Sequence, residues 1–173
     1  MRIITGRLQP AKLALALVLS LSATSCANMG RFAYIMNPEE LSKEELQKLP
    51  YETTPVYRFM VAVEPGAAPL GEELLEDIDV RFTKFSECFG ITDGGKEVSG
   101  YLIAVVQGTF TCVYHRGRCN GEYDPDYSLI IVTYKAFNRK GTLPLLEHEW
   151  AHAYGILASN HENLDEVQKC TRY

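Results

Sequence analysis

The stretch Leu145-Leu-Glu-His-Glu-Trp-Ala-His-Ala-Tyr-Gly155 decides both the fold and the chemistry expected of this chain. It contains two histidines four positions apart, His148 and His152, and Glu149 follows the first of them. In a helix, residues at this spacing lie one turn apart on the same face, so both imidazoles would point toward one place. Two neutral imidazoles in that arrangement can bind a single divalent cation.

The flanking residues predict that this stretch is helical. Thr142 can cap the start of the helix, Pro144 is tolerated in its first turn, and Gly155 can end it. A stripe of apolar residues at helical spacing would pack on a core while the opposite face presents the histidines. This stripe comprises Leu146, Trp150, Ala153 and Leu157. The structural alternative is an amphipathic helix with two partly buried histidines and no ligand.

The residue types explain the expected chemistry. Zinc accepts nitrogen ligands at tetrahedral positions, and a catalytic zinc site keeps three protein ligands and leaves the fourth position to water. The metal lowers the pKa of that water, and a neighbouring carboxylate can take its proton and pass it to a leaving amine. Glu149 is placed for this role.

The pattern His148-Glu-x-x-His152 resembles the motif of the zincin metallopeptidases, in which one helix carries two zinc ligands and the general base. The resemblance implies an α+β fold, with a zincin-like domain built from a small mixed β-sheet, a long helix and the histidine-bearing helix. It also implies zinc as the cofactor, a peptide or protein substrate, and hydrolysis of peptide bonds. Two alternatives stay open: a non-catalytic envelope lipoprotein that uses a zincin-like fold as a binding module, and a metal hydrolase that acts on cell-wall material.

The third zinc ligand is expected in the segment after His152. The candidates there are His161, Glu162, Asp165 and Glu166. His161 is preferred because zinc favours imidazole over a single carboxylate, and Glu162 or Glu166 is the alternative.

The segment Asn160-His-Glu-Asn-Leu-Asp165 resembles the N-E-x-x-S-D motif of the gluzincins, with His161 in place of the ligand glutamate. Asp165, one turn later, would then orient His161 from outside the ligand shell. The structural alternative is a capping box, Asn163 to Glu166, that opens a last helix.

Segments upstream predict the order strand, helix, strand, strand, strand before the histidine helix. The strands are expected at 56–63, 101–106, 110–114 and 127–134, and the helix at 70–89. In zincins an edge strand shortly before the active-site helix pairs with the substrate backbone, and both 110–114 and 127–134 fit that description. The metallopeptidase domain is expected at 55–173, after a lead-in at 27–54 that contains a short helix starting at Asn37.

The first twenty-six residues are predicted to be a targeting signal. Basic residues precede an apolar run, Leu13 to Ala23, that is too short to span a membrane comfortably. Ala23-Thr-Ser-Cys26 resembles the bacterial lipobox, whose cysteine is acylated after cleavage. The resemblance implies an exported protein tethered to a membrane of the bacterial cell envelope through Cys26; ordinary secretory cleavage near Ser25 is the alternative.

Lipidation of Cys26 would leave an even set of cysteines, as suits an oxidising compartment. These are Cys88, Cys112, Cys119 and Cys170. A bridge between Cys112 and Cys119 across a short loop, with Cys88 bonded to Cys170, is one of three possible pairings. His115 lies in that loop, where a solvent-facing position is expected, although it could approach the metal.

The charge balance argues against a nucleic-acid partner. The chain has 17 Lys and Arg against 22 Asp and Glu, a net charge of −5. Loss of the first twenty-six residues, which hold three basic and no acidic groups, would leave 14 against 22 and a net charge of −8. A surface this acidic would repel phosphate backbones.

Overall fold

The computed structural model describes residues 40–113, 117–137 and 144–171. Cys26, His115 and Thr142 lie outside these ranges, so the predictions made for them remain predictions. The chain divides into two units, Met1–Met36 and Asn37–Tyr173, and the described residues belong to the second. Within the described ranges, no helix is both long enough and apolar enough to cross a membrane.

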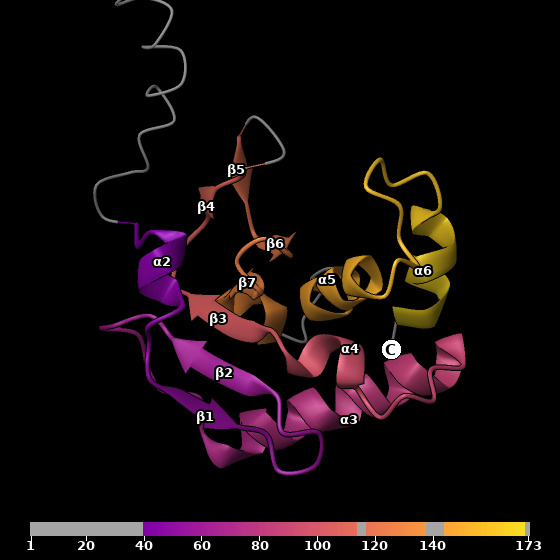
Figure 1. The fold of residues 1–173 in the computed structure, drawn as a ribbon, viewed down its shortest axis with the longest axis horizontal. Coiled ribbons are helices and arrows are strands. Elements are labelled where there is room, and N and C mark those ends of the chain that lie inside the picture. Colours follow the sequence, from indigo (N-terminus) through magenta and orange to yellow (C-terminus); the bar gives the residue numbers. More distant parts are fainter. Residues whose placement is uncertain (1–39, 114–116, 138–143, 172–173) are drawn as a thin grey trace, which may run out of the picture. The chain divides into compact units, whose positions relative to one another are not determined.

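A mixed five-stranded sheet forms the centre of this unit, with the strand order β1-β2-β3-β7-β6 (Figure 1). Its members are β1 (Tyr51–Thr53), β2 (Met60–Val63), β3 (Leu102–Val106), β6 (Gly121–Asp124) and β7 (Leu129–Thr133). Strands β2, β3 and β7 run parallel, whereas the edge strands β1 and β6 are antiparallel to their neighbours. With the helices described next, this gives the predicted α+β class.

Both faces of the sheet are covered, because the central strands are apolar on each side. In β3, Ile103 and Val105 belong to one hydrophobic cluster, and Leu102, Ala104 and Val106 belong to the other. All five side chains are buried. An apolar run of this kind is expected of a strand that is enclosed on both faces.

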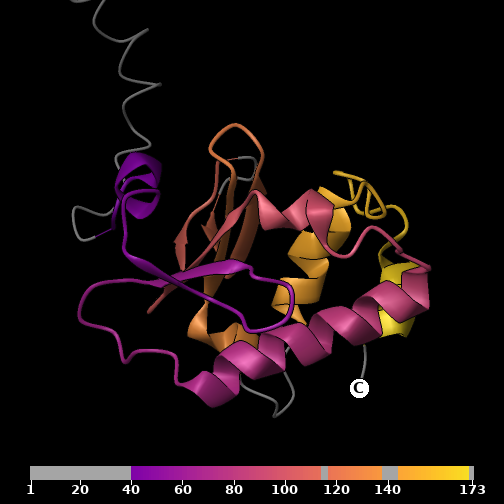
Figure 2. The same cartoon turned by 60° about the horizontal axis from the view of Figure 1, so that its bottom comes forward.

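The two clusters are closed by different helices. The cluster of Ile103 and Val105 includes residues of α3 (Glu72–Phe89), α5 (Leu145–Ala153) and α6 (Leu164–Thr171), and α5 lies at an angle to α3 (Figure 2). The other cluster includes Leu46 of α2 (Lys43–Leu46) and Phe110 of β4 (Phe110–Thr111). The remaining described elements are α4 (Lys96–Ser99), β5 (Arg118–Cys119) and the 3-10 turn Tyr134–Phe137.

Most predicted elements are present with different ends. The helix expected at 70–89 is α3, which stops at Gly90 in the left-handed conformation with φ 67°. The strand expected at 56–63 is formed only from Met60, because residues 55–57 make a turn held by Asp79, whose carboxylate accepts from the amides of Val56 (2.6 Å) and Tyr57 (3.3 Å).

The lead-in contains the short helix α2, whereas the predicted helix start at Asn37 lies outside the described residues. Ser42 is the N-cap of α2, because the Ser42 side chain accepts from the Glu45 amide while the Glu45 carboxylate accepts from the Ser42 amide. Both this helix and β1 fall in the segment predicted as a lead-in; the helix packs on the sheet, and β1 is one of its strands.

Of the two segments predicted as the edge strand near the histidine helix, 127–134 is excluded, and 110–114 contributes a strand that does not belong to the main sheet. Segment 127–134 forms β7, which lies inside the sheet between β3 and β6, and β4 pairs only with β5 in a separate two-stranded sheet. The edge strand that contacts α5 is β6. Its buried side chains are Glu122 and Asp124, so it shows no apolar alternation in the sequence.

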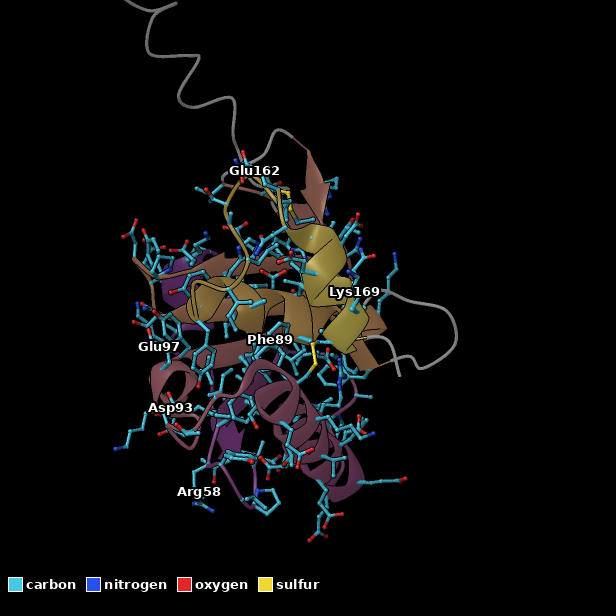
Figure 3. All side chains as sticks on the ribbon, turned by 90° about the vertical axis from the view of Figure 1, so that its right-hand side faces the viewer. Arg58, Phe89, Asp93, Glu97, Glu162 and Lys169 are labelled. Atoms are coloured by element: carbon cyan, nitrogen blue, oxygen red, sulfur yellow. A yellow bond between two sulfur atoms is a disulfide. The ribbon has the colours of Figure 1, made fainter. Side chains whose placement is uncertain are left out.

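Two disulfides are present, and they are the predicted pair. Cys88 near the end of α3 is bonded to Cys170 of α6, which ties the two helices together (Figure 3). Cys112 is bonded to Cys119 and closes the loop between β4 and β5. Disulfides of this kind are typical of proteins in an oxidising compartment.

The two disulfides should contribute unequally to stability, because they close loops of very different length. Cys88 and Cys170 are 82 positions apart, whereas Cys112 and Cys119 are 7 apart. Chain entropy gives about 4.5 kcal/mol for the long loop and about 2.4 kcal/mol for the short one. Urea unfolding of the variant C88A/C170A should therefore show a larger loss than that of C112A/C119A, and an equal or reversed order would contradict this assignment.

Candidate metal centre

Helix α5 is fixed in rotation by Trp150. This side chain is fully buried and meets the ring of Phe82 edge-on, with centroids 5.1 Å apart. Each residue turns a helix by about 100°, so His148 and His152, two positions to either side, point away from the aromatic core. Packing of one tryptophan thus directs both imidazoles outward.

The chain after α5 turns back on the helix. Gly155 has φ 63°, and the amides of Ile156 and Leu157 both donate to the carbonyl of Ala151, at 2.8 and 2.9 Å. Glycine suits this left-handed position because it has no Cβ to clash. The turn brings the carbonyl of Leu157 to 3.1 Å from His152 Nδ1.

A compact loop then returns His161 to the helix. The Asn163 side chain spans this loop, donating to the carbonyl of Ile156 (2.5 Å) and accepting from the amide of Ala158 (3.1 Å). His161 itself has φ 60°, a left-handed conformation that is uncommon for a residue with a side chain. Such backbone strain clusters at functional sites.

The three imidazoles converge at one point. His161 Nε2 lies 3.2 Å from His148 Nε2 and 3.2 Å from His152 Nε2. All three potential ligand atoms lie within 4.8 Å of one another. Nitrogen atoms bound at 2.0–2.1 Å to one tetrahedral zinc ion lie about 3.3 Å apart. The three histidines are therefore close enough to bind a metal ion.

The protonation pattern also suits a metal. Donation from His152 Nδ1 to the Leu157 carbonyl leaves a lone pair on Nε2, and histidine ligands commonly have such a support on the other nitrogen. Burial, followed by the charges of His152 and His161, lowers the pKa of His148 to about 4, so its ring is neutral at neutral pH. Neutral imidazole is the form that binds metal.

Glu149 lies beside the histidines in a tight, buried position. Its side chain is 4% exposed, and the backbone amide of Tyr123 in β6 donates to its carboxylate. A Cβ on Gly121 would come within 2.4 Å of Glu149 Oε1, so only glycine leaves space there. The strand β6 therefore positions the carboxylate through the amide of Tyr123 and through the space left by Gly121.

The pKa of Glu149 is raised to about 8, mainly by burial and then by the charge of Glu122. This value applies to the protein without a metal. A divalent cation at the three histidines would favour the ionised carboxylate and lower that pKa.

The histidines and Glu149 open onto one cavity of about 540 Å³. Its lining also includes Gly121, Glu122 and Tyr123 of β6 and the disulfide-bonded Cys112 and Cys119. The rest of the lining comprises Pro125, Leu157 and Ser159. A volume in this range is typical of small-molecule and side-chain pockets.

The sequence predicted the histidines but missed the residues that support them. His161 joins the pair as predicted, whereas Glu162, Asp165 and Glu166 are exposed. The role of Asp165 in orienting His161 stays a prediction, and the support that the structure does show, the Leu157 carbonyl, is a backbone group without a sequence signal. The capping box at Asn163 is replaced by the contacts of its side chain with residues 156 and 158.

Comparisons with models of known protein families, with curated proteins and with solved structures found no match to this chain. The site is therefore interpreted from its own geometry.

The geometry predicts one tight divalent-metal site per chain that depends on His161. Removal of a ligand should cost more than the 10–100-fold typical of outer supporting groups, so H161A should bind Zn²⁺ at least about 100-fold more weakly than the wild type. The matched control is E166A, which truncates an exposed side chain of α6. Competition with a chelator measures both affinities; full retention of zinc by H161A would remove His161 from the site.

Proposed function

We propose that this protein is an exported zinc-dependent metallopeptidase that hydrolyses peptide bonds. The observation that carries the proposal is the approach of His161 to the pair on α5, to 3.2 Å from each Nε2, with Glu149 buried in the same cavity. A purely structural metal site or a binding module would need the histidines but not the adjacent buried acid.

Zinc is the metal that fits this donor set best. Three imidazole nitrogens suit zinc better than magnesium or calcium, which prefer oxygen ligands. Three protein ligands leave one position open, as in catalytic zinc sites. A zinc ion held by His148, His152 and His161 would supply a Lewis acid that polarises a carbonyl and lowers the pKa of water.

Glu149 is proposed as the general base. Its carboxylate would take a proton from the attacking water and give it to the departing amine, which converts an unstable leaving group into a neutral one. The amide of Tyr123 and the space at Gly121 keep the carboxylate in one orientation beside the histidines. Its burial excludes bulk water that would compete for the proton.

The strand β6 is proposed to bind the substrate backbone. It is an edge of the main sheet and lines the cavity, so a peptide could be added to it as a further strand. Main-chain hydrogen bonds would then align the scissile bond, while the cavity accepts a side chain.

The proposed location follows from the cysteines. The two disulfides agree with an oxidising environment outside the cytoplasm. Acylation of Cys26 would tether the enzyme to a membrane of the bacterial envelope, and mass spectrometry of the mature N-terminus would test this part of the proposal.

Replacement of the base should abolish turnover without loss of the metal. E149Q preserves shape and an oxygen acceptor but cannot take a proton, so hydrolysis of an unfolded protein substrate should fall about 10²–10⁴-fold. Zinc content should match the wild type. Unchanged turnover would exclude Glu149 as the base.

Addition of one methyl group at Gly121 should impair the same step indirectly. G121A places a Cβ against Glu149 Oε1 and must displace the carboxylate, and a displacement of about 1 Å costs about 100-fold in rate. G108A is the matched control, since nothing lies within 4 Å of a Cβ there. Kinetic assays at equal zinc content compare the two, and equal activity would show that Gly121 does not position the base.

A further inference from the structure

Part of the cavity lining, here called the wall, comes from two elements other than α5 and the loop that carries His161. One is β6, and the other is the pair of strands β4 and β5 joined by the disulfide between Cys112 and Cys119, here called the disulfide hairpin (residues 110–113 and 117–119). The separation of these elements sets the space available to a bound molecule.

Lys43 of α2 contacts the strand β6. Its ammonium forms ion pairs with Glu122 and Asp124, and the three side chains are 13%, 6% and 3% exposed. The two carboxylates lie on the same face of one short strand, so without the cation they would be buried like charges close together. Burial opposes the charge of Lys43, yet its hydrogen bonds and the two anions raise its pKa above the ordinary value, which keeps it protonated.

Glu122 connects Lys43 to the disulfide hairpin. One of its oxygens faces the Lys43 ammonium, and the other accepts from the amide of Val113 at 3.2 Å. Glu122 is also one of the residues that line the cavity. A displacement of Lys43 would therefore change the positions of both β6 and the disulfide hairpin.

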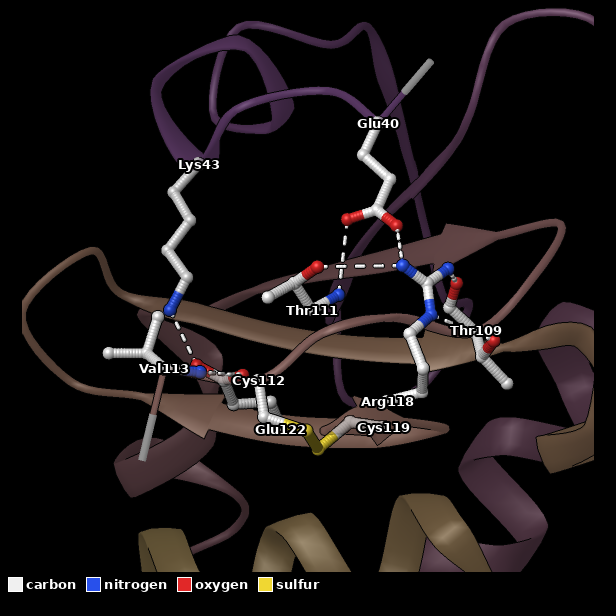
Figure 4. The surroundings of a disulfide bond; sticks show 9 residues. All are labelled: Glu40, Lys43, Thr109, Thr111, Cys112, Val113, Arg118, Cys119 and Glu122. Atoms are coloured by element: carbon white, nitrogen blue, oxygen red, sulfur yellow. Dashed lines mark hydrogen bonds and ion pairs between the residues drawn. A yellow bond between two sulfur atoms is a disulfide. The ribbon is translucent and has the colours of Figure 1, made fainter. Parts of the chain in front are cut away.

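Glu40, just before α2, holds the disulfide hairpin from the other end. One of its oxygens forms an ion pair with Arg118, and the other accepts from the amide of Thr111 at 3.1 Å (Figure 4). Arg118 also donates to the carbonyl and, at 3.2 Å, to the hydroxyl of Thr109. The contacts of Glu40 thus reach both strands that the disulfide joins.

We propose that Glu40 and Lys43 are positioning residues for substrate binding: they fix β6 and the disulfide hairpin at the separation that the substrate requires. The segment of Glu40 and α2, which the sequence predicted as a lead-in, would then be part of the site. This inference rests on the proposed function, because only there is the cavity a substrate site.

A merely structural role makes a different prediction. Leu46 is the one buried residue within α2 itself. If the polar contacts of this helix only hold it in place, removal of any one of them should lower the stability of the protein by a similar amount. Glu44 lies on the same helix and offers the control. Its carboxylate accepts from Tyr127 Oη at 2.8 Å, and neither Glu44 nor Tyr127 lines the cavity.

The test is binding of two probes to the zinc-loaded protein by calorimetry. A tripeptide hydroxamate would occupy the metal and the cavity, whereas acetohydroxamate would occupy the metal alone. K43M and E40Q should bind the tripeptide probe about tenfold more weakly, the size of effect expected from a small misplacement, and acetohydroxamate as the wild type does. K43R should restore binding, and E44Q should leave it unchanged. Equal affinity of K43M and wild type for the tripeptide probe would overturn the inference.

Hydrogen exchange separates this inference from the proposed function. Amides of residues 110–113 and 121–124 should exchange faster in K43M than in E44Q, whether or not the protein hydrolyses peptides. A wild type that binds neither probe would contradict the proposed function, and unchanged exchange in K43M would overturn the positioning role of Lys43 independently.

Discussion

Burial of Trp150 is the constraint on which the rest of the structure depends. Its indole packs among Phe59, Phe82 and Phe85, with ring centroids 5.1 to 6.1 Å away. A helix held by one bulky residue cannot rotate without breaking that packing, so the flanks of α5 are fixed as well. One flank places Glu149 against β6, and the face opposite Trp150 receives His161. Hydrophobic burial, which has no direction of its own, becomes directional through the helix period.

The parts of the site that the sequence revealed are those within one element. His148, Glu149 and His152 share a helix, so their relation follows from its geometry, and α3 was predicted from its apolar period. His161 could be chosen among four candidates after His152 because zinc favours imidazole over a single carboxylate, and no other histidine follows in the sequence. The wall could not be predicted, since β6 buries Glu122 and Asp124, whose partner Lys43 lies 79 and 81 positions earlier. From the sequence alone, Glu122 and Asp124 are predicted to be exposed, because nothing in it indicates that Lys43 is their partner.

The cavity is a product of tertiary structure in a further sense. The cavity is lined by residues of α5, the loop that carries His161, the strand β6 and the disulfide hairpin. Glu40 supports the disulfide hairpin through its ion pair with Arg118. The disulfide between Cys88 and Cys170 joins α3 to α6. Because α6 directly follows the loop that carries His161, this disulfide also holds the end of that loop. A short chain can enclose about 540 Å³ in this way because covalent and ionic ties replace some of the apolar burial that a larger domain would use.

The carbonyl of Leu157 has a consequence for how this site can vary. It fixes the tautomer of His152, yet it belongs to the main chain, so no change of side chain at position 157 removes the acceptor. Only a change in the path of the backbone can do so, and that path depends on Gly155 at φ 63°. The most fragile support of the histidine is therefore a residue without a side chain, which touches neither the imidazole nor anything bound to it.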